Sequence, residues 1–281
     1  MESTPGTPGT PGTPGTTEAS ESMKQVRQSV GALVDGLLDY AGLFPPAKLD
    51  MATTVKNYAA YINDIDAWML SRLIVPTARL DEFEDAAKGL LPTELDDEPW
   101  IISAIVSPAG DPGLASDIER IERFNNTHAD PAEGLAMIDV IELKGADAKV
   151  IDDSIDLIPD ELFPFYEIDW REDPRGCIAA LVGNDAGAKI RTGSLEADQI
   201  PGVDDLARFI AACAATDVPF KATAGLHQPL PHAPDADGGS HGFLNVFIAA
   251  ALANIKRIDE AEIKAVLQEK ELSAFTFHEQ E

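Results

Sequence analysis

Short apolar runs alternate with longer amphipathic runs along most of the chain. From about Met23 onward, each apolar run resembles a buried β-strand, and each amphipathic run has apolar residues at helical spacing. The predicted strands are DYAGLF (39–44), SRLIVP (71–76), IISAIVS (101–107), MIDVIELKG (137–145), LFPFYEIDW (162–170), AKIRTG (188–193), PFKATAG (219–225) and AFTFHE (274–279). The predicted helices include 51–65, 80–91, 115–126, 203–217 and 241–255. Strands that alternate with helices indicate right-handed units with a parallel sheet.

The number of these units predicts the fold class. Eight units over about 250 residues are typical of an α/β protein with a (β/α)8 TIM-type barrel. An open doubly wound sheet is the alternative. No second linker divides residues 23–281, so we expect a single barrel domain there. Residues 1–22 contain a Pro/Gly/Thr repeat that cannot bury apolar surface, and we predict a disordered tail.

Charge and cysteine content exclude several classes of partner. The 281 residues include 49 Asp and Glu but only 21 Lys and Arg, a formal charge of −28, which argues against binding nucleic acid or an anionic membrane. No apolar run reaches the roughly 18 residues that span a bilayer, and no apolar signal core is present, so we expect a cytoplasmic protein.

Cys177 and Cys213 lie in apolar, helix-like runs and are expected to be buried structural thiols.

Polar side chains interrupt four successive predicted strands at positions two residues apart. Residues two apart on a strand share a face, and the residues between them are apolar. We therefore expect the polar face to point at the barrel axis, at the carboxyl ends of the strands, where barrel enzymes have their active sites. A polar active site explains several buried charges better than structural ion pairs do. The pairs are Glu142 with Lys144, Glu167 with Asp169, Lys189 with Arg191, and Lys221 with Thr223.

The two lysines on neighbouring strands have two interpretations. Cations close together lower a lysine pKa, which would free Lys221 as a nucleophile or base beside Lys189. Alternatively, Glu142, Glu167 or Asp169 pairs with the lysines and holds them charged, as binders of an anionic substrate. The sequence leaves both open.

The turn after the sixth predicted strand suits an anionic group. Arg191 and Thr192 begin the segment RTGS, which offers a guanidinium, hydroxyls and accessible backbone amides for a carboxylate or phosphate. At the first strand, Asp39 and Tyr40 either line the same pocket or form a helix end and a core tyrosine.

A long loop, LHQPLPHAPDADGGSHGF, follows the seventh predicted strand. It contains His227, His232 and His241, and loops at this end of a barrel often complete a site. Acid–base chemistry beside Lys221 competes with binding of a divalent metal ion. The histidine spacing matches no metal motif, so we expect no cofactor and no metal ligands, with a divalent ion as the alternative.

The sequence KATAG, residues 221–225, resembles the K-x-[ST]-x-G strand of the deoxyribose-phosphate-aldolase-like class I aldolases, whose lysine forms a Schiff base with a carbonyl substrate. The resemblance covers five residues. It implies the Schiff-base role for Lys221, with Lys189 as the cation that lowers its pKa. That family carries its lysine on the sixth strand, whereas Lys221 lies on the seventh predicted strand. The segments DYAGLFPP, KIRTG, FKATAGLH and HGFLNVFIAAALA together also resemble an uncharacterised bacterial TIM-barrel-like family, which implies no activity.

The first functional hypothesis is a barrel enzyme for a small anionic, oxygen-rich metabolite, most simply a lyase or aldolase that uses Lys221 covalently. The second is a metal-dependent lyase, isomerase or hydrolase that uses His227 and carboxylates, and the third is a non-catalytic small-molecule-binding protein. The partner is a small-molecule substrate, and a homo-oligomer is left open. The predicted catalytic residues are Lys221, Glu142, Glu167, Asp169 and His227, and the predicted substrate-binding residues are Lys144, Lys189, Arg191, Thr192 and Thr223.

Overall fold

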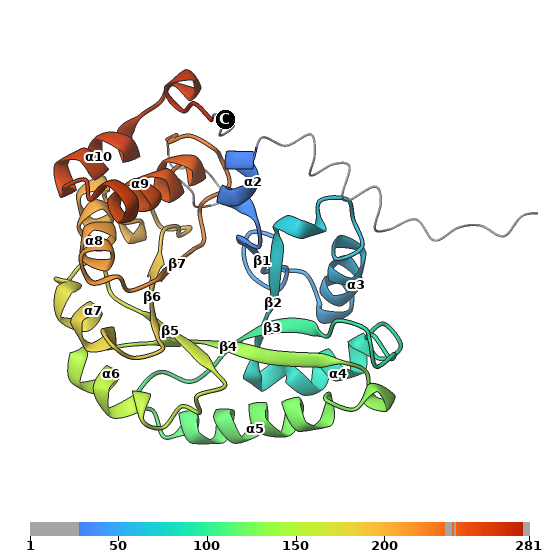
Figure 1. Cartoon of the computed structure of the whole chain (residues 1–281). Helices are drawn as coiled ribbons and strands as arrows, with labels where there is room; N and C mark the ends of the chain where they lie inside the picture. Colours follow the sequence, from blue (N-terminus) through green and yellow to red (C-terminus); the bar gives the residue numbers. More distant parts are fainter. Residues whose placement is uncertain (1–27, 234–237, 239, 278–281) are drawn as a thin grey trace, which may run out of the picture.

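Seven parallel strands form one curled sheet, and their order in the sheet is their order in the chain (Figure 1). The computed structural model describes residues 28–233, 238 and 240–277. The strands are β1 (Leu38–Tyr40), β2 (Leu70–Pro76), β3 (Trp100–Ile105), β4 (Ala136–Lys144), β5 (Phe163–Glu167), β6 (Gly187–Arg191) and β7 (Phe220–Thr223). The predicted disordered tail, residues 1–22, lies outside the described residues.

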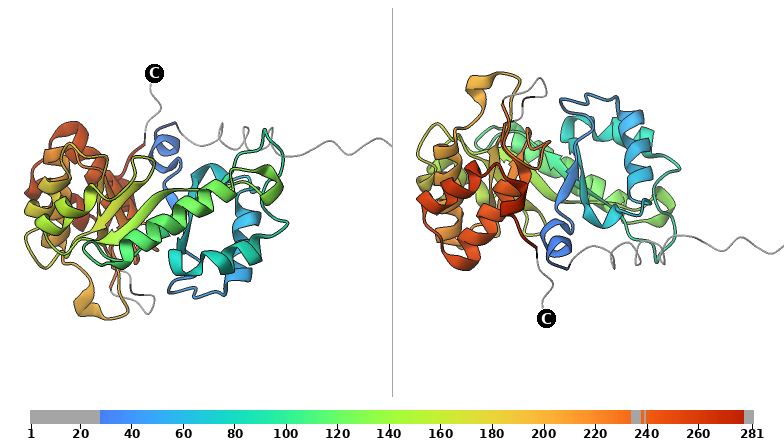
Figure 2. Two further views of the ribbon diagram at one scale, coloured as in Figure 1. Left: turned by 90° about the horizontal axis from the view of Figure 1, so that it is seen from below. Right: turned by 90° about the horizontal axis from the view of Figure 1, so that it is seen from above.

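Helices cover the outside of the curled sheet (Figures 1 and 2). They are α2 (Gln28–Val34), α3 (Met51–Tyr61), α4 (Leu80–Ala87), α5 (Gly113–Thr127), α6 (Ala148–Ile155), α7 (Arg175–Leu181), α8 (Val203–Thr216), α9 (Phe243–Lys256) and α10 (Glu260–Gln268). Short 3-10 turns are at Ala67–Met69, Thr77–Arg79, Pro131–Glu133, Ala197–Gln199 and Leu272–Ala274. Figure 2 shows α9 and α10 beside α8 on one side of the molecule, with α3 and α4 on the other.

Aspartates begin several of the helices. Asp50 accepts a hydrogen bond from the backbone N–H of Thr53 at the start of α3, and Asp147 does the same for Val150 at the start of α6. Asp259 begins α10 with a reciprocal capping box. Each cap satisfies backbone donors that the first helical turn leaves free. These three aspartates therefore stabilise the first turns of α3, α6 and α10.

Alternation along the strands separates the outer core from the interior of the curl. The outer residues Tyr166 and Phe220 contact the helices: Tyr166 shares a hydrogen bond with Ser154 of α6, and Phe220 packs edge-on against Phe209 of α8. One continuous hydrophobic core results, formed by buried residues from Met51 to Leu267. The side chains at the alternate positions face inward, where the polar residues gather.

The predicted α/β class and seven of the predicted strands are confirmed, and the strands keep the sequential order of a barrel, unlike a doubly wound sheet. The prediction of an eighth strand at 274–279 was wrong for the residues the structure describes. Leu272–Ala274 is a 3-10 turn and 275–277 are in no strand; 278 and 279 lie outside the described residues. The alternation in this segment has the period of a strand, but a strand also needs an edge to pair with.

No helix in the described part of the chain combines the length and the apolar character needed to cross a bilayer.

Candidate active site

A buried carboxylate, Glu142 on β4, is the centre of a charged network inside the curled sheet. Its side chain is 1% exposed. Its Oε1 accepts hydrogen bonds from Lys221 Nζ at 2.6 Å and from Ser103 Oγ at 2.7 Å, and its Oε2 lies 2.9 Å from Lys189 Nζ. The two lysines are brought together because their Cα atoms are register partners on β6 and β7. One carboxylate therefore binds both interior ammonium groups.

Each lysine also contacts a second carboxylate. Lys221 forms an ion pair with Asp39 on β1, and its Nζ lies 5.8 Å from the centroid of the Phe165 ring. Lys189 Nζ lies 2.9 Å from Glu167 Oε2 on β5. The contacts form one series in which negative and positive side chains alternate. In order, the residues are Asp39 on β1, Lys221 on β7, Glu142 on β4, Lys189 on β6 and Glu167 on β5. Every charge in it thus has an opposite charge beside it, as burial requires.

The network fixes the protonation states of its central groups. Burial raises the pKa of Glu142, but Lys189 and Lys221 outweigh burial and lower that pKa to about 2. Burial lowers the pKa of Lys189, but Glu142 and Glu167 more than offset it, so the pKa of Lys189 lies above its ordinary value. These shifts favour Glu142 as a carboxylate and Lys189 as an ammonium. For Lys189, the carboxylate-paired interpretation is the one that the contacts favour.

A cavity of about 720 Å³ opens above this network at the carboxyl ends of the strands. Glu142 and Lys189 lie in its wall, whereas Lys221, 13% exposed, is not among the described residues that line it. The other residues that line it are Tyr40, Ala41, Gly42, Phe44, Pro45, Pro46, Ala47, Ile74, Ile105, Arg191, Gly193, Ser194, Leu195, Glu196, Thr223, Ala224, Gly225, Leu226 and His227. The volume is that of a small-molecule site.

Two glycines allow the turns after β6 and β7 to meet at the cavity. A Cβ atom added to Gly193 would lie 2.4 Å from Gly225 Cα, so the two backbones touch where no side chain fits. Gly225 also has φ +75°, a conformation that glycine adopts without strain. The repeated pattern Lys-x-x-x-Gly, read at 189–193 and 221–225, thus places two lysines in register and then lets the chains converge.

Arg191 and Thr223 lie at the upper part of the polar wall. Arg191 is 54% exposed, and its Nε lies 3.9 Å from Glu167 Oε1. The buried Oγ1 of Thr223 has no hydrogen-bond partner among the described residues. A buried hydroxyl without a partner is costly unless a ligand or water satisfies it. Both side chains are therefore suited to contact a bound molecule.

The structure brings seven of the ten predicted site residues into the network or the wall above it: Glu142, Glu167, Lys189, Arg191, Lys221, Thr223 and His227. Lys144 is exposed at the end of β4, and Asp169 is exposed and pairs with Arg171 at 3.0 Å. Thr192 is fully buried, and its Oγ1 donates a hydrogen bond to the Ala224 carbonyl at 2.6 Å, joining the ends of β6 and β7. None of these three side chains has a contact with the network in the described part of the chain.

The three histidines of the predicted loop lie in different environments. His227 is exposed and lines the cavity. His241 is buried, its Nε2 lies 2.8 Å from the Pro201 carbonyl, and burial lowers its pKa. The backbone N–H of His232 donates to the Ser240 carbonyl. Within the described residues, no three His, Cys, Asp or Glu side chains are arranged to hold a metal ion.

Sequence reasoning missed two polar contributors to the interior. Ser103 interrupts the apolar strand β3 at an inward position, which was the available signal, and its hydroxyl holds Glu142. Arg72 and Asp139 form a two-bond ion pair at 2.8 and 2.7 Å, nearer the amino ends of their strands. Asp139 lies where the β3–β4 register shifts, a bulge that alternation along one strand does not reveal.

Of the two cysteines predicted to be buried, Cys213 is buried and Cys177 is only half-buried. Cys213 is buried and burial raises the pKa of its thiol to about 12. Cys177 is half-buried, and its thiol pKa is also raised by burial. Burial therefore favours the protonated form of both thiols.

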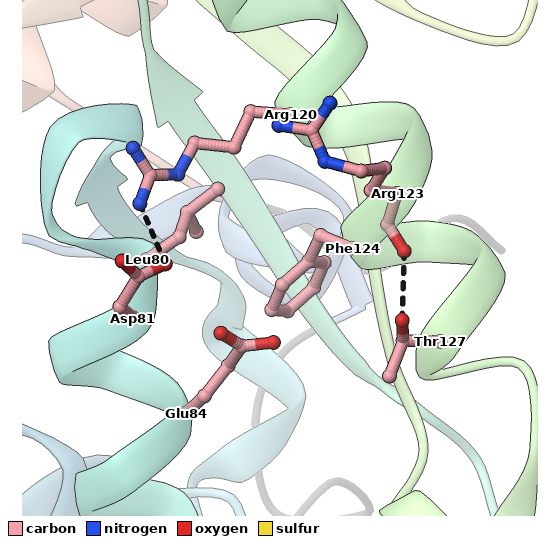
Figure 3. A pocket seen from close by; sticks show the side chains of 7 residues that line it. All are labelled: Leu80, Asp81, Glu84, Arg120, Arg123, Phe124 and Thr127. Atoms are coloured by element: carbon pink, nitrogen blue, oxygen red, sulfur yellow. Dashed lines mark hydrogen bonds and ion pairs between the residues drawn. The ribbon is translucent and has the colours of Figure 1, made fainter.

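A second hollow, of about 490 Å³, lies between α4 and α5 on the outside of the sheet (Figure 3). Its residues are Leu80, Asp81, Glu84, Arg120, Arg123, Phe124 and Thr127. Figure 3 shows Arg120 bound to Asp81, at 2.5 Å, and Thr127 bound to the Arg123 carbonyl. The Arg120–Asp81 ion pair joins α5 to α4, whereas the Thr127–Arg123 hydrogen bond lies within α5. The hollow lies away from the strand ends where the network is found.

No protein-family model and no curated protein sequence matches this chain. Among solved structures, it is similar to the citrate lyase beta subunit from M. tuberculosis, complexed with oxaloacetate and magnesium, with a TM-score of 0.38 and 14% identity over 68% of this chain and 79% of that one. It is also similar to the catalytic domain of a hyperthermophilic chitinase from Pyrococcus furiosus, with a TM-score of 0.42 and 10% identity over 82% of this chain and 92% of that one. Both likenesses are too distant to bear on substrate or reaction.

Proposed function

We propose that the protein is a lyase that forms an imine between an interior lysine and a small anionic carbonyl compound. One observation carries the proposal: two lysine amines share the buried carboxylate of Glu142 directly beneath a cavity of about 720 Å³. Such a cluster of buried, coupled charges below a cavity is typical of an active site.

The contacts favour Lys189 as the amine that meets the carbonyl group. Lys189 lines the cavity, whereas Lys221, the lysine that the sequence favours, does not line it and is bound by Asp39 and Glu142. In this arrangement Lys221 is a second ammonium that keeps Glu142 charged.

Imine formation needs a neutral amine, so Lys189 must first lose a proton. Glu167, whose side chain is 17% exposed, is the better acceptor, because Glu142 with a pKa of about 2 is a weak base. The amine then adds to the carbonyl carbon to give a carbinolamine. Glu167 returns the proton to the carbinolamine hydroxyl, which leaves as water, and the nitrogen becomes a protonated imine.

The protonated imine withdraws electrons from the adjoining carbon, which lets a neighbouring carbon–carbon bond break. The electron pair of that bond moves into the enamine, and a hydroxyl on the departing fragment gives its proton to Glu167 as it becomes an aldehyde. Arg191 at the cavity rim is placed to hold the anionic group of the substrate. The same residues therefore supply the electron sink, the base and the anchor that a lyase requires.

The metal-dependent alternative is not favoured by the contacts of the described residues. Glu142 and Glu167 are bound to ammonium groups, Asp169 is paired with Arg171, and His227 is exposed at the rim.

Borohydride trapping tests the proposal. The protein is incubated with pyruvate and borohydride, and intact mass and peptide mapping identify any adduct in the wild type and in Lys189→Met, Lys221→Met and Lys144→Met. We expect an adduct on the peptide of Lys189 that is lost in Lys189→Met and kept in Lys144→Met, whose lysine is exposed outside the network.

An adduct at Lys221 that is lost only in Lys221→Met would keep the imine reaction but assign it to the other amine. Binding of pyruvate without an adduct in any of the four proteins would overturn the enzyme proposal in favour of a small-molecule-binding protein.

A further inference from the structure

The cavity is divided into an apolar half and a polar half, and the division follows the order of the strands. Strands β2 and β3 and the loop after β1 supply apolar side chains, while β4, β6, β7 and the loops after β6 and β7 supply the charged and hydroxyl groups. Tyr40 of β1 adds a phenol, whose oxygen accepts a hydrogen bond from Asn57. We infer that the substrate is an amphipathic carbonyl compound, with an unbranched or aromatic apolar group at one end and a carboxylate at the other. This inference rests on the proposed function for the position of the carbonyl group.

The apolar half is a continuous surface. Ile74 on β2 and Ile105 on β3 are inward residues whose side chains reach the cavity, with Ile74 7% exposed. Phe44, Pro45 and Pro46 cover the cavity from the loop between β1 and α3. These five side chains carry no hydrogen-bonding group. A polyhydroxylated substrate would lose its hydrogen bonds to water here without gaining any, which is unfavourable.

The polar half is suited to the other end of the substrate. Lys189 and Arg191 share one face of β6, and both lie within reach of the same carboxylate, Glu167. Thr223 adds a buried hydroxyl that has no partner among the described residues. A carboxylate next to the carbonyl group would meet Arg191 and the Thr223 hydroxyl while the carbonyl carbon faces Lys189.

The two halves meet between β3 and β4. Ile105 and Glu142 are register partners there, and the backbone N–H of Val106 donates to the Glu142 carbonyl. The apolar wall therefore begins one strand away from the carboxylate that binds Lys189. A substrate whose carbonyl carbon is at Lys189 extends its apolar group over Ile105 and Ile74. Ile105 is on this basis the residue that determines specificity for that group.

Calorimetric titration with a series of 2-oxo acids of one charge tests the inference. Pyruvate, 2-oxobutyrate, 2-oxopentanoate and 2-oxohexanoate add one methylene at a time, and each buried methylene should strengthen binding about fourfold. In Ile105→Thr we expect 2-oxohexanoate to bind about 5- to 10-fold more weakly and pyruvate to bind as before. The control is Ile101→Thr, on the same strand and face but not in the cavity wall, which should change neither affinity.

The titration tests the amphipathic substrate and the trapping experiment tests the imine reaction, so each proposal can be overturned separately. Affinity that does not rise along the series, or a loss in Ile105→Thr that is equal for pyruvate and 2-oxohexanoate, overturns the amphipathic substrate even if pyruvate is trapped on a lysine. Affinity that rises along the series, with no adduct, supports the divided cavity and overturns the imine reaction. If none of the four acids binds at millimolar concentration, both are overturned.

Discussion

Lys221 on β7 and Asp39 on β1 form an ion pair that joins the two edge strands of the sheet, 182 residues apart in the chain. Asp39 also accepts a hydrogen bond from the backbone N–H of Arg72 at 3.0 Å, so the pair is anchored to β2 as well. In a barrel of eight strands, the eighth strand would lie between β7 and β1, which are the two edges that the Lys221–Asp39 pair joins here. Side chains, in place of a backbone ladder, therefore connect the first strand to the last.

Asp39→Asn should weaken this connection. The variant keeps the shape of the side chain but removes the charge that faces Lys221, leaving that ammonium with Glu142 alone. We expect the free energy of unfolding in urea to fall by about 2 kcal/mol, the contribution of a charged hydrogen bond in a partly buried site. Asp81→Asn, which breaks an ion pair whose aspartate is 80% exposed, is the control and should cost less than about 1 kcal/mol. Equal losses in both variants would show that the Lys221–Asp39 contact does not join the strands.

Glu142 should give the stability of the protein a marked acid dependence. Its pKa is about 2 in the folded protein and 4.5 ordinarily, so its stabilising effect is present above pH 4.5 and is lost as pH falls towards 2. This shift in the pKa of Glu142 corresponds to about 3 kcal/mol in the free energy of unfolding. The measurement is urea unfolding of wild type and Glu142→Gln from pH 7 to pH 2, in which the difference between the two proteins should narrow by about that amount below pH 4.5. If the difference in unfolding free energy between wild type and Glu142→Gln does not change with pH, Glu142 is not the source of the acid dependence.

Thr223 and Thr192 form a matched pair for testing the cavity wall. Thr223→Val removes a hydroxyl that has no protein partner among the described residues, so the free energy of unfolding should stay the same or rise by up to about 1 kcal/mol. Thr192→Val removes a donor bound to the Ala224 carbonyl and should destabilise the protein by about 1–3 kcal/mol. If the Thr223 hydroxyl contacts the substrate, Thr223→Val should also weaken 2-oxo acid binding several-fold. Unchanged affinity in Thr223→Val would place the ligand elsewhere in the cavity.

Gly193→Ala should disrupt the approach of the two strand-end turns. The added Cβ would lie 2.4 Å from Gly225 Cα and 2.6 Å from the Gly238 carbonyl oxygen, and backbone atoms cannot move aside as a side chain can. We expect a loss of about 2–4 kcal/mol, or a failure to fold. Gly176→Ala is the control, because a Cβ at this position in α7 meets nothing within 4 Å, and it should stabilise the protein by about 0.5–1 kcal/mol. Thermal unfolding of both variants tests the prediction, and similar melting temperatures would contradict it.

Patterns within single segments predicted the elements well, because those patterns are local. The period of apolar residues located seven strands and several of the helices between them. The segment 274–279 had the same strand-like alternation, yet residues 274–277 form no strand. Whether such a segment pairs depends on an available edge, and this information lies in no single segment.

The candidate site shows the same division. Alternation placed Glu142, Lys189 and Lys221 on inward faces, and their strand register brought them together. It also predicted Lys144 and Asp169, which have inward parity but are exposed: Lys144 is the last residue of β4, and Asp169 lies two residues beyond the end of β5. Ser103 was not predicted, since one hydroxyl in an apolar strand becomes meaningful only when a buried carboxylate is beside it.

The sequence by itself determined the α/β class, the order of strands and helices and the polar inward face, because each follows from the short-range periodicity of apolar and polar residues. Only the tertiary structure decided which lysine lines the cavity, which carboxylate binds each ammonium, and that Asp39 and Lys221 join the edges of the sheet. These depend on register and curvature, which bring residues from distant segments within a few ångströms. The raised pKa of Lys189 and the lowered pKa of Glu142 follow from that proximity, since the interaction between charges depends on their separation and burial.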